Sequence, residues 1–96
     1  MQYNFEWNSN KAKSNIQKHK INFELAATVF KDPRALSIYD DDHSESEERW
    51  ITLGIAQNGN LLVVIHTYKN VDHNLSNIRI ISARKATRLE QKQYKE

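Results

Sequence analysis

The 96-residue sequence has a formal net charge of +2, two glycines, one proline and no cysteine. This composition is that of an ordinary globular domain, and the lack of cysteine excludes disulfides, thiolate zinc sites and cysteine nucleophiles. No apolar run approaches the roughly 18 residues of a membrane span, and the N-terminus lacks the layout of a signal peptide. We therefore expect one soluble, cytosolic domain over residues 1–96.

Charge is unevenly distributed along the chain. Residues 40–48, DDDHSESEE, hold six of the twelve acidic residues, which leaves fourteen Lys and Arg residues against six acids elsewhere. A basic domain body favours an anionic partner, and nucleic acid is the commonest large one, although a solubilising mixture of surface charges has the same composition. The close carboxylates of 40–48 have no hydrophobic surroundings in the sequence, so they are typical of a solvated loop rather than an acid and base pair.

The first forty residues predict a strand, two helices and a second strand. Alternation of Tyr3, Phe5 and Trp7 with polar residues is typical of a half-buried strand. Asn8 can cap a helix from about Ser9 to His19. Asn22 can cap a second helix that ends before Pro33, and a short strand follows at 35–39. The apolar residues of the second helix recur at helical spacing: Phe23, Ala26, Ala27 and Phe30.

A hairpin is predicted at Asn58-Gly59, because a type I′ turn requires positive φ at both central residues. If these two residues form the whole loop, the facing pairs are Ile55 with Leu62, Leu53 with Val64, Ile51 with His66, and Arg49 with Tyr68. We expect the two N-terminal helices to pack on the aliphatic part of this face: Ile51, Leu53, Ile55, Leu62 and Val64. The opposite face would carry Trp50 and Ile65, and it is apolar enough to need cover from a partner or from the C-terminal helix.

The C-terminal segment predicts a polar loop at 69–77, a strand over 78–81 and a last helix. Ser82 is suited to cap this helix, with Ala83, Ala86, Leu89 and Tyr94 as its apolar stripe. Arg84 and Lys85 would then lie in the first turn, where the helix dipole disfavours cations by roughly 0.3 to 1 kcal/mol each. A phosphate bound at that terminus would explain their presence. The alternative is that they extend into solvent or pair with Glu48 or the acidic loop.

Several classes of site are disfavoured by the residues present. Two glycines are too few for a phosphate-cradling loop, and the four histidines show no metal-ligand spacing, so we expect no cofactor and no metal. A divalent cation at 40–48 stays a minor alternative. The remaining candidates are basic: Lys18, His19, Arg49, His66, Arg79, Arg84, Lys85 and Arg88.

Five separated blocks of the sequence resemble the BrnT toxin family of type II toxin-antitoxin systems. They are FEW with KAKSNIQKH, FELAATVFKDP, DDDHSESEERWITLG, LLVVIHT, and IRIISARKAT followed by Tyr94. The resemblance implies a RelE-like α+β fold in which a small, mostly antiparallel sheet carries an N-terminal helix pair and a C-terminal helix, in the order β-α-α-β-β-β-β-α. It implies a ribonuclease that arrests growth and is neutralised by a ribbon-helix-helix antitoxin of the BrnA type. It also implies a complex of two toxin and two antitoxin chains that binds operator DNA through the antitoxin.

Three positions depart from the family pattern. Lys20 stands where relatives usually have glycine, at a cost of roughly 1 kcal/mol if the left-handed conformation is retained. Around Tyr68 to Asn77 relatives usually have a shorter turn with a basic residue, whereas this chain has the longer KNVDHNLSN. Asn60 replaces a common arginine. We expect these changes to weaken RNA contacts.

RNA supplies its own nucleophile, the 2′-hydroxyl, so a metal-independent ribonuclease needs a base, an acid and cations for the developing charge. We expect Arg79 and Arg84 at the scissile phosphate, Arg49 in support, and His66 or His19 in proton transfer, unless these histidines are only structural. RNA contacts are expected from Lys18, Lys85, Arg88 and Tyr94. The alternative role for Lys18 is that of the catalytic acid, and the alternative for Tyr94 is a place in the hydrophobic core. The competing hypothesis is a non-catalytic module that binds nucleic acid or antitoxin as a corepressor.

Overall fold

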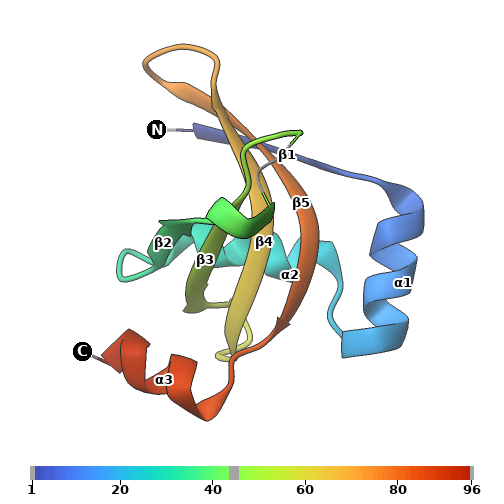
Figure 1. Cartoon of the computed structure of the whole chain (residues 1–96), viewed down its shortest axis with the longest axis vertical. Coiled ribbons are helices and arrows are strands. Elements are labelled where there is room, and N and C mark those ends of the chain that lie inside the picture. The colour runs from blue at the N-terminus through green and yellow to red at the C-terminus, as the bar shows by residue number, and fades with distance from the viewer. Residues whose placement is uncertain (1, 44–45, 96) are drawn as a thin grey trace.

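The computed structural model describes residues 2–43 and 46–95, and Figure 1 shows their arrangement. Its strands are β1 (Gln2–Trp7), β2 (Leu36–Tyr39), β3 (Trp50–Ile55), β4 (Leu61–Asn70) and β5 (Leu75–Lys85). Its helices are α1 (Ser9–His19), α2 (Phe23–Ala27), α3 (Arg88–Lys95) and the 3₁₀ turns η1 (Thr28–Lys31) and η2 (Asp41–His43). Ser44 and Glu45 of the predicted acidic loop lie outside the described residues.

The five strands form one mixed sheet in the order β1-β5-β4-β3-β2. β1 runs parallel to β5, and the other neighbours are antiparallel. The predicted α+β class is therefore confirmed, whereas the RelE-like assignment stays a prediction. No helix in the described part of the chain has the length and apolar character needed to cross a membrane.

The two N-terminal helices begin at the predicted capping residues. The Asn8 side chain accepts hydrogen bonds from the amides of Asn10 and Lys11 at 2.9 and 3.1 Å, and α1 has the predicted bounds. The Asn22 side chain accepts from the Leu25 amide at 2.7 Å. These bonds satisfy backbone donors that have no partner inside a helix, so local sequence is sufficient to define both starts.

We call the side of the sheet that carries α1 and α2 the inner face, and the other side the outer face. The core lies on the inner face, where Leu62, Val64, Ile78, Ile80 and Ala83 of the sheet meet apolar helix residues. Those helix residues are Phe23, Ala26 and Val29. All eight side chains are at most 1% exposed, so this layer is the main hydrophobic contribution to stability.

Gly54 of β3 permits the close approach of η1 to the sheet. A Cβ atom at this position would lie 2.7 Å from Val29 Cγ1 and 3.1 Å from Ala35 Cβ. Glycine is therefore needed here for packing space.

The predicted register of the β3–β4 hairpin is wrong by one residue. Ala56 donates to the Asn60 carbonyl at 2.8 Å, so the loop has the three residues 57–59, with Gly59 at φ +89°. Trp50 therefore pairs with His66 and Leu53 with Val63. Three-residue loops with glycine in the left-handed region are the next hairpin class after the two-residue type I′ loop.

A shift of one residue moves each side chain of β3 to the other face relative to β4. Thr52 therefore joins Val64 on the inner face, and Arg49 is not the partner of Tyr68. The helices do not pack on the predicted Ile51, Leu53 and Ile55, which lie on the outer face. Trp50 and Ile65, predicted to share a face, lie on opposite faces.

The predicted polar loop at 69–77 is also wrong, because both strands continue through most of it. β4 extends to Asn70 and β5 begins at Leu75, so only four residues turn the chain. The Asp72 side chain closes this turn by accepting from the Asn74 and Leu75 amides at 2.8 and 3.0 Å. The hairpin projects beyond the rest of the sheet at the top of Figure 1.

The predicted start of the last helix at Ser82 is wrong. Ser82, Arg84 and Lys85 are strand residues of β5, and α3 begins at Arg88. Thr87 and Glu90 form a reciprocal cap, in which the Thr87 amide donates to Glu90 Oε1 at 2.8 Å and the Glu90 amide donates to Thr87 Oγ1 at 3.2 Å. The T-x-x-E spacing of a capping box was present in the sequence at 87–90 and would have located this start.

Candidate active site

The outer face of β5 presents Arg79, Ser82 and Arg84 in a row. Opposite them on β4 lie Thr67, Ile65 and Val63 respectively. A bulge in β5 leaves Ile81 without a partner in this register, and it keeps both arginines on the outer face although they are five positions apart. The two arginines are separated by four residues of β4, or about 13 Å at ~3.3 Å per residue. We call Arg79, Ser82 and Arg84 the β5 row.

Arg79 and the predicted Arg49 come together at one carboxylate. Arg79 Nη2 forms an ion pair with Glu47 Oε2, and Arg49 Nε lies 3.9 Å from Glu47 Oε1. Figure 1 shows the segment that leads into β3 crossing in front of β4, which allows a loop residue to reach β5. Glu47 was missed because it was read as one acid of a solvated loop, and no local signal distinguishes it from its neighbours.

A hollow of about 330 Å³ adjoins this cluster on the outer face. It is lined by Glu6, Glu47, Glu48, Thr67, Lys69, Asn77 and Arg79. The Arg79 and Glu47 side chains are 41% and 37% exposed, so their ion pair is open to solvent.

Arg84 is paired with the capping residue of α3. Its Nη1 and Nη2 atoms donate to the two oxygens of Glu90 at 2.8 and 2.9 Å. The hydrogen bond from Arg84, with those from Thr87, lowers the pKa of Glu90 to about 2, and the pKa of Arg84 is raised in turn. The expected phosphate site at a helix N-terminus is therefore wrong, because Arg84 precedes the helix and its charge is balanced within the chain.

Asn15 attaches α1 to the free edge of β5. β1 pairs with β5 only as far as Ile80, so the following residues of β5 need another partner on that side. The buried Asn15 amide accepts from the Ala83 amide at 3.0 Å and donates to the Ala83 and Ile21 carbonyls at 2.8 and 2.9 Å. A side chain thus takes the place of a neighbouring strand for one residue.

This attachment brings the end of α1 to the β5 row. A hollow of about 240 Å³ is lined by Lys11, Ser14, Asn15, Lys18, His19, Ile81 and Ser82. Lys18 and His19 therefore lie across a shared hollow from Ser82, the middle member of the row. Of the two predicted histidines, His19 is the one that the fold places beside β5 at Ser82.

His66 lies on the inner face and cannot share a site with Arg79 and Arg84. Its ring is 2% exposed, with Nδ1 3.0 Å from the Thr67 carbonyl and Nε2 2.6 Å from Thr52 Oγ1. Because a carbonyl only accepts, Nδ1 is the protonated nitrogen and Nε2 accepts from Thr52. Burial lowers the pKa of His66, which favours the neutral ring in this tautomer.

The other predicted RNA contacts are spread around the C-terminal end. Lys85 is an exposed residue at the end of β5, and Arg88 begins α3. The Tyr94 hydroxyl donates to Asp32 Oδ2 at 2.5 Å, and the Arg34 guanidinium lies 5.6 Å from the Tyr94 ring centre. Tyr94 therefore fastens α3 to the body of the protein, and the Asp32 hydrogen bond raises its pKa.

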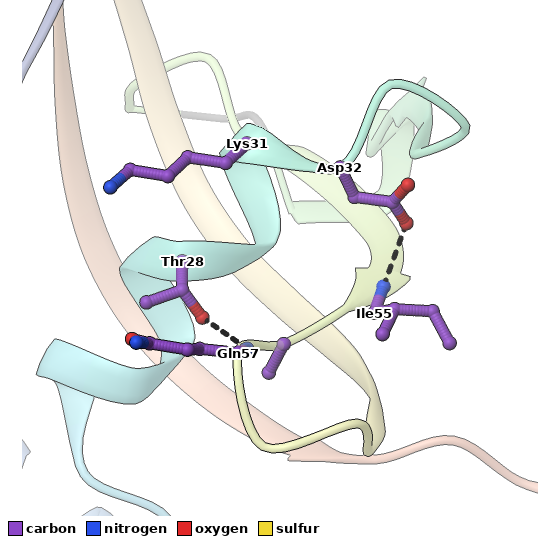
Figure 2. A pocket seen from close by; sticks show the side chains of 6 residues that line it. Thr28, Lys31, Asp32, Ile55 and Gln57 are labelled. Atoms are coloured by element: carbon purple, nitrogen blue, oxygen red, sulfur yellow. Dashed lines mark hydrogen bonds between the residues drawn. The ribbon is translucent and has the colours of Figure 1, made fainter.

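Asp32 also joins η1 to the sheet beside a hollow of about 380 Å³, shown in Figure 2. Its Oδ2 atom accepts from the Ile55 amide at 2.9 Å, and Thr28 Oγ1 accepts from the Gln57 amide at 2.8 Å. Burial acts to raise the pKa of Asp32, but the hydrogen bonds from Ile55, Tyr94 and Arg34 hold it below its ordinary value. The Asp32 and Thr28 side chains in this hollow thus hold η1 against the β3–β4 hairpin.

Among the described residues, no three His, Asp or Glu side chains are grouped to hold a metal ion. The sequence pattern of the family described as "Ribonuclease toxin, BrnT, of type II toxin-antitoxin system" matches residues 7–90. The chain belongs to the BrnT family. The fold of this BrnT chain is similar to the 1.1 Å crystal structure of the Brucella abortus ribonuclease toxin BrnT, with a TM-score of 0.63 and 18% identity over 92% of this chain and 100% of that one. No protein of curated function matches the chain in sequence.

Proposed function

We propose that this BrnT chain cleaves RNA without a metal ion, at a site formed by the β5 row, Glu47, Lys18 and His19. The observation that carries the proposal is that two distant segments reach neighbouring positions along β5, one at Arg79 and the other at Ser82. The segment before β3 supplies Glu47 and Arg49, β5 supplies Arg79, and the end of α1 supplies His19 beside Ser82. Membership of a ribonuclease toxin family supports the reaction class.

In this proposal Arg79 binds the scissile phosphate. The Arg79–Glu47 pair is about two-fifths exposed on each side, and exposed pairs contribute only about 0 to 1 kcal/mol. A phosphate can therefore replace Glu47 as the partner of Arg79 at little cost. The guanidinium then stabilises the extra negative charge that develops as the 2′-oxygen attacks phosphorus.

Two groups are placed to move protons. Glu47, released from Arg79, accepts the proton of the attacking 2′-hydroxyl, and His19 donates a proton to the departing 5′-oxygen. The 2′-oxygen to phosphorus bond forms as the bond to the 5′-oxygen breaks, which leaves a 2′,3′-cyclic phosphate and a free 5′-hydroxyl. Lys18 holds a neighbouring backbone phosphate, and Arg84 reaches RNA only when it exchanges Glu90 for a phosphate.

The test is cleavage of RNA by the purified chain in excess EDTA. Arg79→Ala and His19→Gln should each lower the cleavage rate by about 10²-fold or more, as expected for loss of a preorganised charge or a proton donor. Lys18→Ala should weaken RNA binding, whereas the matched change Lys13→Ala on an exposed position of the same helix should not. His73→Gln on the projecting hairpin is the matched control for His19→Gln.

Cleavage that is absent in EDTA and restored by a divalent cation would contradict metal independence. A well-folded chain that binds RNA or DNA without cleaving it under either condition would favour the non-catalytic module instead. His66→Gln separates the two histidines, because we expect it to lower stability and not to act specifically on the rate of cleavage by the folded protein.

We further propose a ribbon-helix-helix antitoxin of the BrnA type as the neutralising partner, in a complex of two toxin and two antitoxin chains that contacts operator DNA through the antitoxin. Membership of a type II toxin-antitoxin family supports this partner class. Co-purification with the protein encoded beside this chain, followed by light scattering, measures the stoichiometry. Cleavage that continues at saturating antitoxin would contradict neutralisation.

A further inference from the structure

The edge strand β2 is exposed along its whole length. All four residues of Leu36–Tyr39 are exposed, and on the outer face Leu36 and Ile38 are 45% and 62% exposed. β2 is the last strand of the sheet, beyond β3. An apolar edge strand of this kind favours pairing with another strand.

The backbone of β2 is oriented for such pairing. The Asp40 amide donates to the Arg49 carbonyl. Because backbone groups alternate in direction along a strand, the N–H and C=O groups of Ile38 and Leu36 also point toward β3. The N–H and C=O groups of Ser37 and Tyr39 therefore point to the open edge. These groups can form the ladder hydrogen bonds of an added strand.

Charge along this edge indicates which strand would fit. The sequence before β2 has Lys31 and Arg34, and Asp32 between them is engaged within the chain by the Ile55 amide and the Tyr94 hydroxyl. The sequence after β2 is acidic at Asp40, Asp41 and Asp42. Arg34, Asp41 and Asp42 are exposed. In an antiparallel pair of identical strands, the basic start of each copy meets the acidic end of the other. The edge is therefore complementary in charge to a second copy of itself.

From these observations we infer that two copies of this chain pair through antiparallel β2 strands about a two-fold axis at Ser37, forming a continuous ten-stranded sheet. Each Leu36 then faces Ile38 of the second copy, and each Arg34 is level with Asp40 of the second copy, next in sequence to the exposed Asp41. The pairing is isologous, so it closes as a dimer and does not propagate. A short edge buries little area, which predicts a weak dimer.

The chain's lack of cysteine allows a test of this register by single substitutions. In the proposed dimer the two Ser37 residues are a hydrogen-bonded pair with Cα atoms about 5.5 Å apart, within the range of a disulfide. Ser37→Cys should therefore form disulfide dimers in a glutathione buffer at least about 10-fold faster than the exposed control Ser9→Cys. Leu36→Cys and Ile38→Cys should crosslink efficiently only when the two variants are mixed.

Sedimentation over roughly 10 µM to 1 mM protein, the range of a weak interface, measures the dimer without crosslinking. Ile38→Asp and Asp41→Arg should each abolish the dimer, whereas Glu24→Arg on the exposed side of α2 should not. A chain that is monomeric throughout, with equal oxidation of Ser37→Cys and Ser9→Cys, would overturn the inference. Because β2 is three strands from β5, RNA cleavage by the Ile38→Asp monomer should be unchanged, so this result is independent of the proposed function.

Discussion

Position 20 should be one where glycine is more stable than alanine. Lys20 ends α1 in the left-handed region at φ 61° and ψ 31°, and it is the only non-glycine residue with positive φ in the described part of the chain. Its amide donates to the Ile16 carbonyl at 2.9 Å, so the conformation is needed to close the helix. The left-handed conformation costs a residue with a Cβ atom roughly 1 to 2 kcal/mol.

Lys20→Gly removes this cost but increases the entropy of the unfolded chain by roughly 0.5 to 1 kcal/mol. The lysine charge also interacts favourably with the C-terminal end of the helix dipole. Lys20→Ala removes the charge and keeps the Cβ atom, so the comparison of Gly with Ala isolates the backbone contribution. We expect the Gly variant to exceed the Ala variant by about 0.5 to 1 kcal/mol in free energy of unfolding, or about 2 to 8 °C in Tm for a domain of this size.

Gln17 provides the matched control, because it is exposed on the same helix and has ordinary helical geometry. There Gly should be less stable than Ala by about 1 kcal/mol, which is the opposite sign. Urea denaturation at constant m-value measures all four variants. If Gly is less stable than Ala at position 20 as well as at 17, the left-handed conformation of Lys20 is not a source of strain and the reasoning fails.

Two further predictions concern the cap of α3 and the packing of η1. Glu90→Gln should lower stability by about 1 kcal/mol at neutral pH, because it weakens the cap and the pair with Arg84. The pKa of Glu90 is lowered in the folded state, so its contribution to stability is present above the ordinary value near 4.5 and is lost as pH falls toward about 2. Urea titrations over this pH range compare the unaltered protein with Glu90→Gln. A stability difference that does not shrink as pH falls would contradict this role of Glu90. Gly54→Ala should cost about 1 to 3 kcal/mol, since its Cβ would lie 2.7 Å from Val29 Cγ1, and an unchanged urea midpoint would show that η1 can move away freely.

The parts of the fold that were predicted well are those determined by neighbouring residues. Asn8 and Asn22 cap their helices through side-chain bonds to amides two or three residues ahead, so a window of a few residues is sufficient. The family resemblance pointed to Lys20, where relatives usually have glycine, and the structure shows that the left-handed conformation is retained there. The start of α3 belongs to the same class, since the Thr87 and Glu90 spacing was in the sequence and was overlooked in favour of Ser82.

The hairpin register shows how a small local ambiguity can have a large consequence. Asn58-Gly59 fits both a two-residue and a three-residue loop, and the two differ by one residue in register. Burial of Thr52 and Val64 together under the helices is what distinguishes them, and this depends on the whole inner face. The error placed His66 beside Arg49, whereas the sheet separates them.

The candidate site was predicted only in part, for the same physical reason. Sequence by itself determined the residue types, the basic character of β5 and the two helix caps, because these depend on composition and on contacts within a few positions. Only the tertiary structure decided that Glu47 reaches Arg79 across 32 positions, and that Asn15 holds His19 beside Ser82 through bonds to a residue 68 positions away. Such contacts depend on where distant segments pack against the same sheet, and this placement cannot be inferred from patterns among neighbouring residues.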